Sequence, residues 1–373
     1  MRLLICAGGT GGGVYPALAV LQALKNPDLE TLWVGGTGGM EAELVQQAGV
    51  PFESIPAAGL HGVGLRKLPG NLWRLSNGVL AARRILRRFR PQVLFFTGGY
   101  VAFPVALAAR TLRPRPRVVL YVPDIEPALA LKTLARFADQ IMLTTEESRR
   151  FFPAHRPTMV TGYPIRAELT GWKRQAARAH FGLSDDAPVV LVFGGSLGAR
   201  SINQALQQNL PALLPEVQVL HISGQRDWNA VQSAASALSA DIRARYHCFP
   251  YLHGADMGAA LAAADLVLSR AGASSIGEFP FFRLPSILVP YPHAWRYQQV
   301  NAAYLERHGA AQILPDADLM TALAPTILKL ARAPEQLAAM RRALQDMAKP
   351  HAAQTIGQYL IQPPSGQGAK HYG

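Results

Sequence analysis

The sequence predicts an α/β protein with two doubly wound parallel-sheet domains. Apolar runs of strand length alternate with helical patterns along most of the 373 residues, which is typical of parallel sheets covered by helices. Loops of glycine and other small residues follow three of the apolar runs, at residues 8–13, 194–199 and 271–275. The alternation restarts at Val189, which indicates that the second half is a Rossmann-like domain of its own.

Four segments are expected along the chain. The boundary between the two domains is expected in the Thr161-Gly162-Tyr163-Pro164 stretch, so the N-terminal domain spans residues 1–162 and the C-terminal domain residues 163–349. A late helix at residues 351–361 is expected to pack back on the first domain. Residues 363–373 are expected to form a disordered tail.

In the first half, the loop at residues 8–13 leads into a helix at about Pro16, a proline that suits a first helical turn. In the second half, the loop at residues 194–199 opens a helix near Ser201. The expected strands are Arg2–Ala7, Thr31–Val34, Val50–Ile55, Val93–Thr97, Val118–Tyr121 and Gln140–Thr144, followed by Val189–Phe193, Val217–Ile222, Ala264–Leu268 and Ser286–Val289.

The composition is that of a globular intracellular protein, with 49% hydrophobic and 16% charged residues. Cys6 and Cys248 lie in opposite halves inside apolar runs, which favours a reducing compartment without disulfides. The apolar start of the chain is too short for a signal peptide. Val93–Ala109 carries no charge, but glycines and Pro104 interrupt it, so we interpret it as strand, turn and helix rather than a membrane span.

The stretch from Ser269 to Asn301 predicts a nucleotide site. A strand turns through the small residues 271–275 onto a helix start, where backbone N–H groups and the helix dipole favour a phosphate. Glu278, one turn further on, can accept hydrogen bonds from the two hydroxyls of a ribose. Gln298 and Gln299 suit sugar hydroxyls. The alternative is an ordinary βαβ unit with a surface glutamate.

Two common nucleotide-binding motifs do not fit this sequence. A dinucleotide site needs an acidic residue at the end of the second strand, whereas Glu30 precedes that strand. No phosphate-loop motif with a lysine after its glycines occurs in the chain. Because neither motif fits, the loops at residues 8–13 and 194–199 need another explanation.

Four segments together resemble the MurG glycosyltransferases of peptidoglycan synthesis. They are GGTGGGVYPALAV at Gly8–Val20, GGYVAFPVALAA at Gly98–Ala109, GGSLGARSINQ at Gly194–Gln204 and SRAGASSIGE at Ser269–Glu278. The resemblance covers nearly the whole chain and includes QQVNA at Gln298–Ala302. It implies the GT-B architecture and transfer of N-acetylglucosamine (GlcNAc), with inversion, from UDP-GlcNAc to the lipid-linked diphosphate lipid I, giving lipid II.

The resemblance also implies a set of site residues. It assigns contacts with UDP-GlcNAc to the second domain and to Arg166, whose fork of donors can reach a diphosphate, although a surface salt bridge is the alternative for Arg166. It places the first glycine loop on the sugar and acceptor side. The implied substrate-binding residues are Thr10, Gly11, Gly12, Arg166, Ser196, Leu252, Ala273, Ser274, Ser275, Ile276, Gly277, Glu278 and Gln298.

The chain departs from the family pattern mainly on the acceptor side. The family usually has histidine where Gly13 stands, and His-Glu-Gln-Asn where Tyr121-Val122-Pro123-Asp124 stand. A base is still expected, because attack by a sugar hydroxyl is helped by proton removal. Asp124, at the carboxyl end of a strand, is the first candidate, with an N-cap of a helix at Ala128–Ala138 as its alternative role. His61 is a weaker second candidate.

Other functions remain open at this stage. A related transferase with another lipid acceptor, a UDP-GlcNAc epimerase, or a donor-binding module without catalysis could use the same fold. We expect no cofactor and no metal, because no Asp-x-Asp pattern stands near the donor loops and a helix dipole with Arg166 can neutralise the leaving diphosphate.

The net charge of +13 predicts an anionic partner, and most of that charge lies in residues 1–162. The segment Arg66–Arg90 contains eight basic residues and no acidic one, with an apolar stripe at helical spacing. We expect this segment to bind the anionic cytoplasmic face of the cell membrane, as a peripheral contact. The alternative is a core-packed helix whose arginines face solvent. No nucleic-acid recognition motif accompanies the charge.

Overall fold

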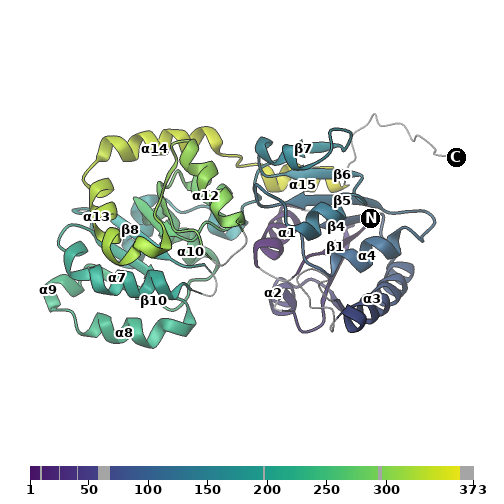
Figure 1. The fold of residues 1–373 in the computed structure, drawn as a ribbon, viewed down its shortest axis with the longest axis horizontal. Helices are drawn as coiled ribbons and strands as arrows, with labels where there is room; N and C mark the ends of the chain where they lie inside the picture. Colours follow the sequence, from purple (N-terminus) through teal and green to yellow (C-terminus); the bar gives the residue numbers. More distant parts are fainter. Residues whose placement is uncertain are drawn as a thin grey trace. The chain divides into compact units, whose positions relative to one another are not determined.

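The computed structural model describes residues 1–8, 11–24, 26–39, 41–57, 68–195, 198–292 and 296–361. The chain forms two compact units (Figure 1). Unit 1 contains Met1–Pro123, Pro127–Arg166 and the segment from Pro350, whereas unit 2 contains Asp124–Glu126 and Ala167–Lys349. The chain therefore changes unit after Arg166, and the short segment Asp124–Glu126 belongs to unit 2 although both its neighbours belong to unit 1.

A parallel sheet of seven described strands forms the centre of unit 1, in the order β3-β2-β1-β4-β5-β6-β7. The order reverses between β1 and β4, which is where ligands bind in doubly wound sheets. The strands are β1 (Arg2–Cys6), β2 (Glu30–Gly36), β3 (Phe52–Ile55), β4 (Val93–Phe96), β5 (Arg117–Val122), β6 (Gln140–Leu143) and β7 (Thr158–Val160).

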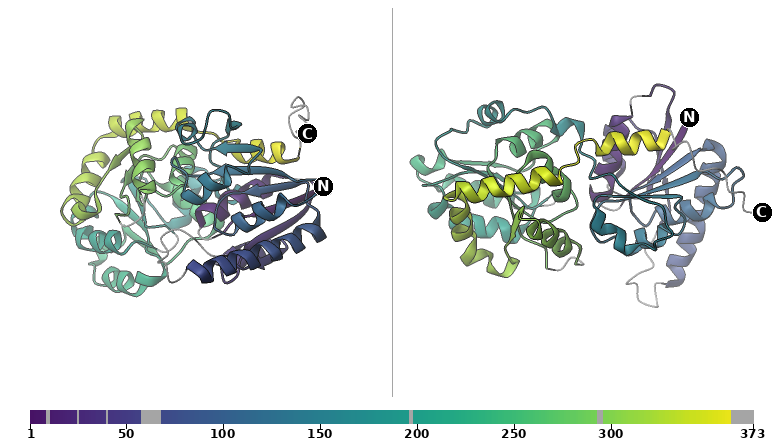
Figure 2. Two further views of the ribbon diagram at one scale, coloured as in Figure 1. Left: turned by 45° about the vertical axis from the view of Figure 1, so that its right-hand side comes forward. Right: turned by 90° about the horizontal axis from the view of Figure 1, so that it is seen from above.

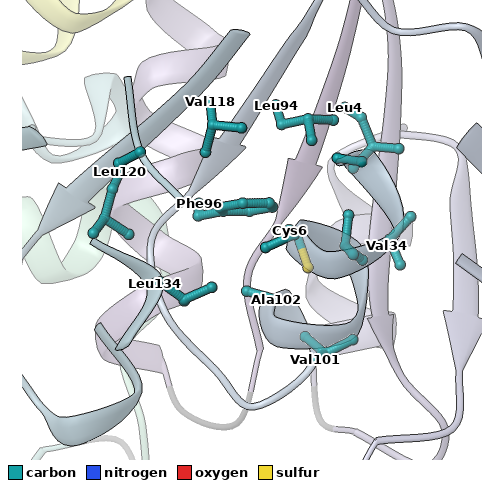
Figure 3. Packing of buried hydrophobic residues seen from close by; sticks show 14 of the residues in the cluster. Leu4, Cys6, Val34, Leu94, Phe96, Val101, Ala102, Val118, Leu120 and Leu134 are labelled. Carbon is teal, nitrogen blue, oxygen red and sulfur yellow. The ribbon is translucent and has the colours of Figure 1, made fainter. Parts of the chain in front are cut away.

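Helices cover both faces of this sheet because side chains alternate along each strand. Leu4 and Cys6 belong to a core shared with α3, α4 and α5, part of which is drawn in Figure 3. Leu3 and Ile5 belong to a second core, shared with α1, α2 and α15. The helices are α1 (Gly11–Ala23), α2 (Glu41–Gln47), α3 (Leu68–Phe89), α4 (Ala102–Ala109), α5 (Leu129–Leu134), the 3-10 helix η2 (Glu146–Phe151) and α15 (Ala352–Ile361).

Unit 2 repeats the design with six described parallel strands in the order β10-β9-β8-β11-β12-β13, so that its order reverses between β8 and β11. The strands are β8 (Val189–Phe193), β9 (Gln218–Ile222), β10 (Tyr246–Phe249), β11 (Leu266–Ser269), β12 (Ser286–Leu288) and β13 (Ala311–Ile313). The helices are η3 (Ala167–Leu169), α6 (Arg174–Phe181), α7 (Arg200–Leu213), η4 (Gln225–Asp227), α8 (Trp228–Ser236), α9 (Ala240–Arg243), α10 (Gly254–Ala263), α11 (Ser275–Phe282), α12 (Tyr297–Arg307), η5 (Asp316–Asp318), α13 (Leu319–Ala331) and α14 (Pro334–Met347).

The expected fold class is confirmed, and two local expectations are wrong. Helix α1 begins at Gly11, within the glycine loop, so that Pro16 lies inside the helix rather than in its first turn. Helix α5 is only six residues long and ends at Leu134 instead of reaching Ala138. The tail expected at residues 363–373 lies outside the described residues.

Helix α15 packs against α1 within unit 1 (Figure 2). Arg117 at the start of β5 donates hydrogen bonds to the carbonyl oxygens of Tyr359 and Leu360, each at 2.8 Å. Its guanidinium carbon also lies 4.9 Å from the centre of the Tyr359 ring. A cation at the last carbonyls of a helix satisfies groups that have no partner within the helix, so Arg117 anchors α15 to the sheet.

Three buried polar side chains of unit 2 are hydrogen-bonded in a row between the sheet and α7. His221 on β9 is completely buried, with Nδ1 lying 2.7 Å from the Tyr246 hydroxyl and Nε2 lying 2.9 Å from Oδ1 of Asn203. Burial lowers the pKa of His221 from 6.5 to about 3. The folded protein therefore holds this ring neutral at pH values at which the unfolded chain takes up a proton.

This difference makes unfolding pH-dependent. The unfolded state binds the extra proton below pH 6.5, so the free energy of unfolding should fall as the pH drops from 6.5 towards 3. Between pH 6.5 and 5 the free energy of unfolding should fall by about 1.5 kcal/mol more in the unmodified protein than in its His221→Gln variant. Urea unfolding at the two pH values measures this difference. The matched control is His155→Gln, which changes an exposed histidine. Its free energy of unfolding should fall between pH 6.5 and 5 by as much as that of the unmodified protein. An equal loss in His221→Gln would contradict the prediction.

Candidate active site

The loop after β8 is packed too closely for side chains at two of its glycines. A Cβ atom at Gly194 would lie 2.2 Å from the backbone nitrogen of Ala199. At Gly198, where φ is +76°, a Cβ would lie 2.3 Å from the carbonyl oxygen of Ser223. Glycine is required there for both space and backbone conformation. Ser196, the site residue implied in this loop, lies outside the described residues.

The loop after β11 leads into α11, beside the loop after β8 at the point where the strand order reverses. The Ser275 hydroxyl donates to the Gly272 carbonyl at 2.6 Å. The backbone N–H groups of residues 275–278 donate to carbonyls of residues 272–274, so these four donors are already used within the turn and the start of the helix. A Cβ at Gly272 would meet no atom within 4 Å, so there is open space beside this residue, whereas Ala271, Ala273 and Ser275 are buried.

Five further candidates of unit 2 lie in different environments. Glu278 lies in the first turn of α11 and is buried, at 7% exposure. Gln298 lies in the first turn of α12, half-buried, and its Oε1 accepts a hydrogen bond from the Tyr291 N–H at 2.9 Å. Leu252 packs half-buried against the apolar cluster on one face of the sheet. Ile276 is also buried, and Gly277 follows it in α11.

Arg270, directly after β11, was missed by sequence reasoning. It donates to the Val289 carbonyl at 3.1 Å, to Asp316 Oδ1 at 2.5 Å and to the Ser201 hydroxyl at 2.8 Å. These contacts tie together the ends of β11 and β12 and the start of α7, which surround the strand-order reversal. The sequence feature that could have indicated Arg270 is an arginine between a buried strand and a run of small residues.

Asp124 is held by α12 through Asn301, which is completely buried. The Asn301 Nδ2 group donates to Asp124 Oδ1 at 2.9 Å and to the Ala271 carbonyl at 3.2 Å. Its Oδ1 accepts a hydrogen bond from the backbone N–H of Ile125 at 3.2 Å. The base candidate therefore belongs to the same unit as Glu278 and Gln298, and it is hydrogen-bonded to the helix that carries Gln298.

The environment of Asp124 shifts its titration. Burial raises the pKa of the Asp124 carboxyl above its ordinary value, and the hydrogen bond from Asn301 partly opposes that rise. The alternative role as an N-cap is wrong, because the N-cap residue of α5 is Ala128 and no side chain caps that helix. A raised pKa brings a carboxylate closer to the range in which it removes protons effectively near neutral pH.

The candidates of unit 1 lie near α1. Arg166 stacks on Tyr15 of α1, with its guanidinium carbon 4.3 Å from the ring centre. Gly11 and Gly12 form the first turn of the same helix. The Thr97 hydroxyl donates to the Gly13 carbonyl at 2.6 Å, and a Cβ at Gly13 would lie 3.4 Å from the Thr97 carbonyl oxygen. Thr10 and His61 lie outside the described residues.

The candidates thus fall into two groups. Unit 2 contains Asp124, the run Ala273–Glu278, Gln298 and Leu252, whereas unit 1 contains Gly11, Gly12 and Arg166.

Within the described ranges, no group of three or more histidine, cysteine or acidic side chains could hold a metal ion. No helix in the described part of the chain is long and apolar enough to cross a bilayer.

The sequence matches known proteins over nearly its whole length. Residues 3–143 match the N-terminal domain of glycosyltransferase family 28, and residues 189–356 match its C-terminal domain. A protein from Roseiflexus sp. (strain RS-1), named UDP-N-acetylglucosamine–N-acetylmuramyl-(pentapeptide) pyrophosphoryl-undecaprenol N-acetylglucosamine transferase, is 39% identical to this chain. That match covers 95% of this chain and 93% of the relative.

The fold matches solved structures as well. MurG from Acinetobacter baumannii superposes with a TM-score of 0.76 at 25% identity, covering 96% of this chain and 99% of that one. A UDP-GlcNAc 2-epimerase from Neisseria meningitidis reaches a TM-score of 0.65 at 14% identity, over 97% of this chain and 100% of that one. The second likeness shows only a shared fold. The sequence matches decide the family, and the chain belongs to glycosyltransferase family 28, within the MurG family of N-acetylglucosamine transferases.

Proposed function

We propose that this chain transfers GlcNAc from UDP-GlcNAc to lipid I, which is undecaprenyl-diphosphoryl-N-acetylmuramoyl-pentapeptide, to give lipid II for the cell wall. Family membership supports the reaction class, and the name of the Roseiflexus relative supports both substrates. The observation that carries the mechanism is the placement of Asp124, because Asn301 holds it in the unit that carries the donor candidates.

Unit 2 binds the donor in this proposal. The N–H groups of Ala273 and Ser274 receive the diphosphate ahead of α11, where the helix dipole favours negative charge. Glu278 accepts hydrogen bonds from the ribose, and Gln298 contacts the GlcNAc hydroxyls through its amide. The resemblance to the MurG family assigns Arg166 to the diphosphate, and Gly11 and Gly12 to the acceptor side.

Asp124 acts as the general base. It takes the proton from the attacking hydroxyl of the muramyl sugar while that oxygen bonds to the anomeric carbon of GlcNAc. The bond between this carbon and the UDP oxygen breaks at the same time, and UDP leaves with the electron pair, which inverts the configuration. The raised pKa of Asp124 strengthens it as a proton acceptor.

An epimerase is the main alternative from another class, because the fold alone does not separate the two activities. The products do separate them. Transfer yields UDP and a glycosylated lipid, whereas a hydrolysing epimerase yields UDP and free N-acetylmannosamine. A transferase acting on another lipid would yield a glycosylated lipid of different mass, and a binding module would yield no product.

The basic helix α3 supports a peripheral location at the cytoplasmic face of the membrane. Its apolar stripe is internal, because Ala82, Ile85 and Leu86 belong to the core beneath it. Another face is open to solvent and combines apolar with basic residues. Trp73 is 68% exposed and Leu80 is 55% exposed, and further along the helix Arg84 and Arg87 are exposed as well.

These four residues follow one another at spacings of seven, four and three, so they share one side of α3. We call this side the α3 outer face, formed by Trp73, Leu80, Arg84 and Arg87. Aromatic and aliphatic side chains beside arginines suit the boundary of an anionic bilayer. Arg88 is not part of this face, because it pairs with Glu53. Arg66, at the start of the basic segment, lies outside the described residues.

The donor assignment predicts different effects for two variants. Glu278→Gln should weaken UDP and UDP-GlcNAc binding alike, by roughly 10- to 100-fold, because both ligands carry the ribose and a charged hydrogen-bond acceptor is lost. Gln298→Ala should weaken UDP-GlcNAc by roughly 3- to 10-fold and leave UDP unchanged. Calorimetric titration measures both. The control is Gln232→Ala, at an exposed residue of α8, which should not change the affinity for either ligand. Equal losses of affinity for both ligands in Gln298→Ala would show that Gln298 does not contact the sugar.

The base assignment predicts that Asp124→Asn keeps the affinity for UDP-GlcNAc and lowers turnover to glycosylated lipid about 10²- to 10⁴-fold. The turnover number of the unmodified enzyme should rise with pH through the raised pKa of Asp124, above the usual aspartate range, because only the carboxylate accepts the proton. The variant should lack this rise. Nearly normal turnover of Asp124→Asn would remove Asp124 from the catalytic machinery and leave His61 or solvent as the proton acceptor.

The α3 outer face predicts binding to vesicles that contain anionic lipids, with release by salt. Arg84→Gln together with Arg87→Gln should lower the partition coefficient about 10-fold or more, since each cation near such a surface contributes about 1 kcal/mol. Trp73→Ser together with Leu80→Ser should lower the fraction of vesicle binding that added salt does not release. The charge-matched control is Arg226→Gln with Arg342→Gln, both exposed in unit 2. An equal loss in this control would mean that only net charge matters.

A further inference from the structure

Three consecutive residues between β5 and α5 contact helix α12. Asp124 and the backbone N–H of Ile125 bond to Asn301, and the next residue, Glu126, bonds to Arg296 at the N-cap of α12. The helix thus holds the segment at two points. Nothing in the local sequence of this segment, PDIEP, indicates a partner that lies 170 residues further along the chain.

The contact between Glu126 and Arg296 is a bidentate ion pair. Arg296 Nε lies 2.7 Å from Glu126 Oε2, and Nη2 lies 2.7 Å from Oε1. The Glu126 side chain is only 6% exposed, whereas that of Arg296 is 68% exposed. Two parallel hydrogen bonds fix both distance and orientation, and a carboxylate that is this buried needs a partner to stay charged.

Both contacts are on the helix that carries the proposed sugar contact. Gln298 stands between Arg296 and Asn301 in sequence, and α12 joins all three through its backbone. Among the residues that the structure describes, Asn301 holds the Asp124 side chain through one hydrogen bond. Asn301 also accepts the Ile125 N–H, and the bonds between Glu126 and Arg296 hold the segment at a second point, two residues beyond Asp124.

We propose that Glu126 and Arg296 are a positioning pair, which clamps the segment 124–126 onto α12 so that Asp124 keeps a fixed place relative to Gln298 and the donor sugar. This inference rests on the proposed role of Asp124 as the base. Neither member of the pair touches substrate in this account. Both act through Asp124, and the pair therefore affects the chemical step rather than donor binding.

The first test is Glu126→Ala. Removing this carboxylate leaves Arg296 exposed to water, so no unpaired charge stays buried and folding should survive. A base displaced by about 1 Å can cost up to 100-fold in rate, so kcat for lipid glycosylation should fall about 10-fold. The KM for UDP-GlcNAc and the Kd for UDP should stay within about twofold. Glu126→Gln, which can still accept one hydrogen bond from Arg296, should lose less, about threefold.

A second ion pair in unit 2 supplies the matched control. Glu216 and Arg332 also form two hydrogen bonds, at 2.7 and 2.5 Å, but on a more exposed surface. Glu216→Ala should leave kcat and KM unchanged. If Glu126→Ala behaves like this control, or if it raises the KM for UDP-GlcNAc and leaves kcat unchanged, the proposal is wrong.

A double-mutant cycle with Arg296→Ala tests whether the two residues act as a pair. The effect of Arg296→Ala on kcat should nearly vanish when Glu126 is already alanine, and additive effects would contradict the pairing. Asp124→Asn separates this inference from the function itself. Slow turnover of Asp124→Asn with normal turnover of Glu126→Ala would overturn only the positioning role. Normal turnover of Asp124→Asn would overturn the base assignment and the inference with it.

Discussion

The carboxamide of Asn301 uses both of its polar atoms in the interior of unit 2. Its oxygen accepts the Ile125 N–H, and its nitrogen donates to Asp124 and to the Ala271 carbonyl. An amide with no exposed surface must satisfy these groups internally, because an unsatisfied one costs about 1–3 kcal/mol. Three parts of the site therefore have one anchor: helix α12, the loop that begins at Ala271, and the segment that carries Asp124.

The sheets and the donor loops could be predicted because their signals are local. Each strand that the sequence predicted lies within about two residues of the strand observed. The strands β7, β10 and β13 were not predicted, and each is at the edge of its sheet. Their residues are mostly only half-buried, so their apolar signal is weak. The run Ala273–Glu278 was found because strand, small-residue turn and helix follow one another directly.

The contacts around Asp124 could not be predicted from the sequence, because they join residues far apart in the chain. Nothing in PDIEP or in RYQQVN reveals that Asp124 pairs with Asn301 and Glu126 with Arg296. The same holds for Arg270, whose partners Ser201, Val289 and Asp316 come from three other parts of unit 2. The apolar stripe of α3 was predicted from its spacing, but only the core contacts of Ala82 and Leu86 show that this stripe faces the interior rather than a membrane.

The environment of Asp124 suits the role of base that we propose for it. A carboxylate that serves as a base must be desolvated enough to be a good proton acceptor, yet it must remain ionised in the working pH range. Burial of Asp124 provides the first condition, and the hydrogen bond from Asn301 favours the charged form and limits the rise in pKa. The base that we propose thus belongs to the same compact unit as Glu278 and Gln298, and Asn301 joins it to the helix that carries Gln298.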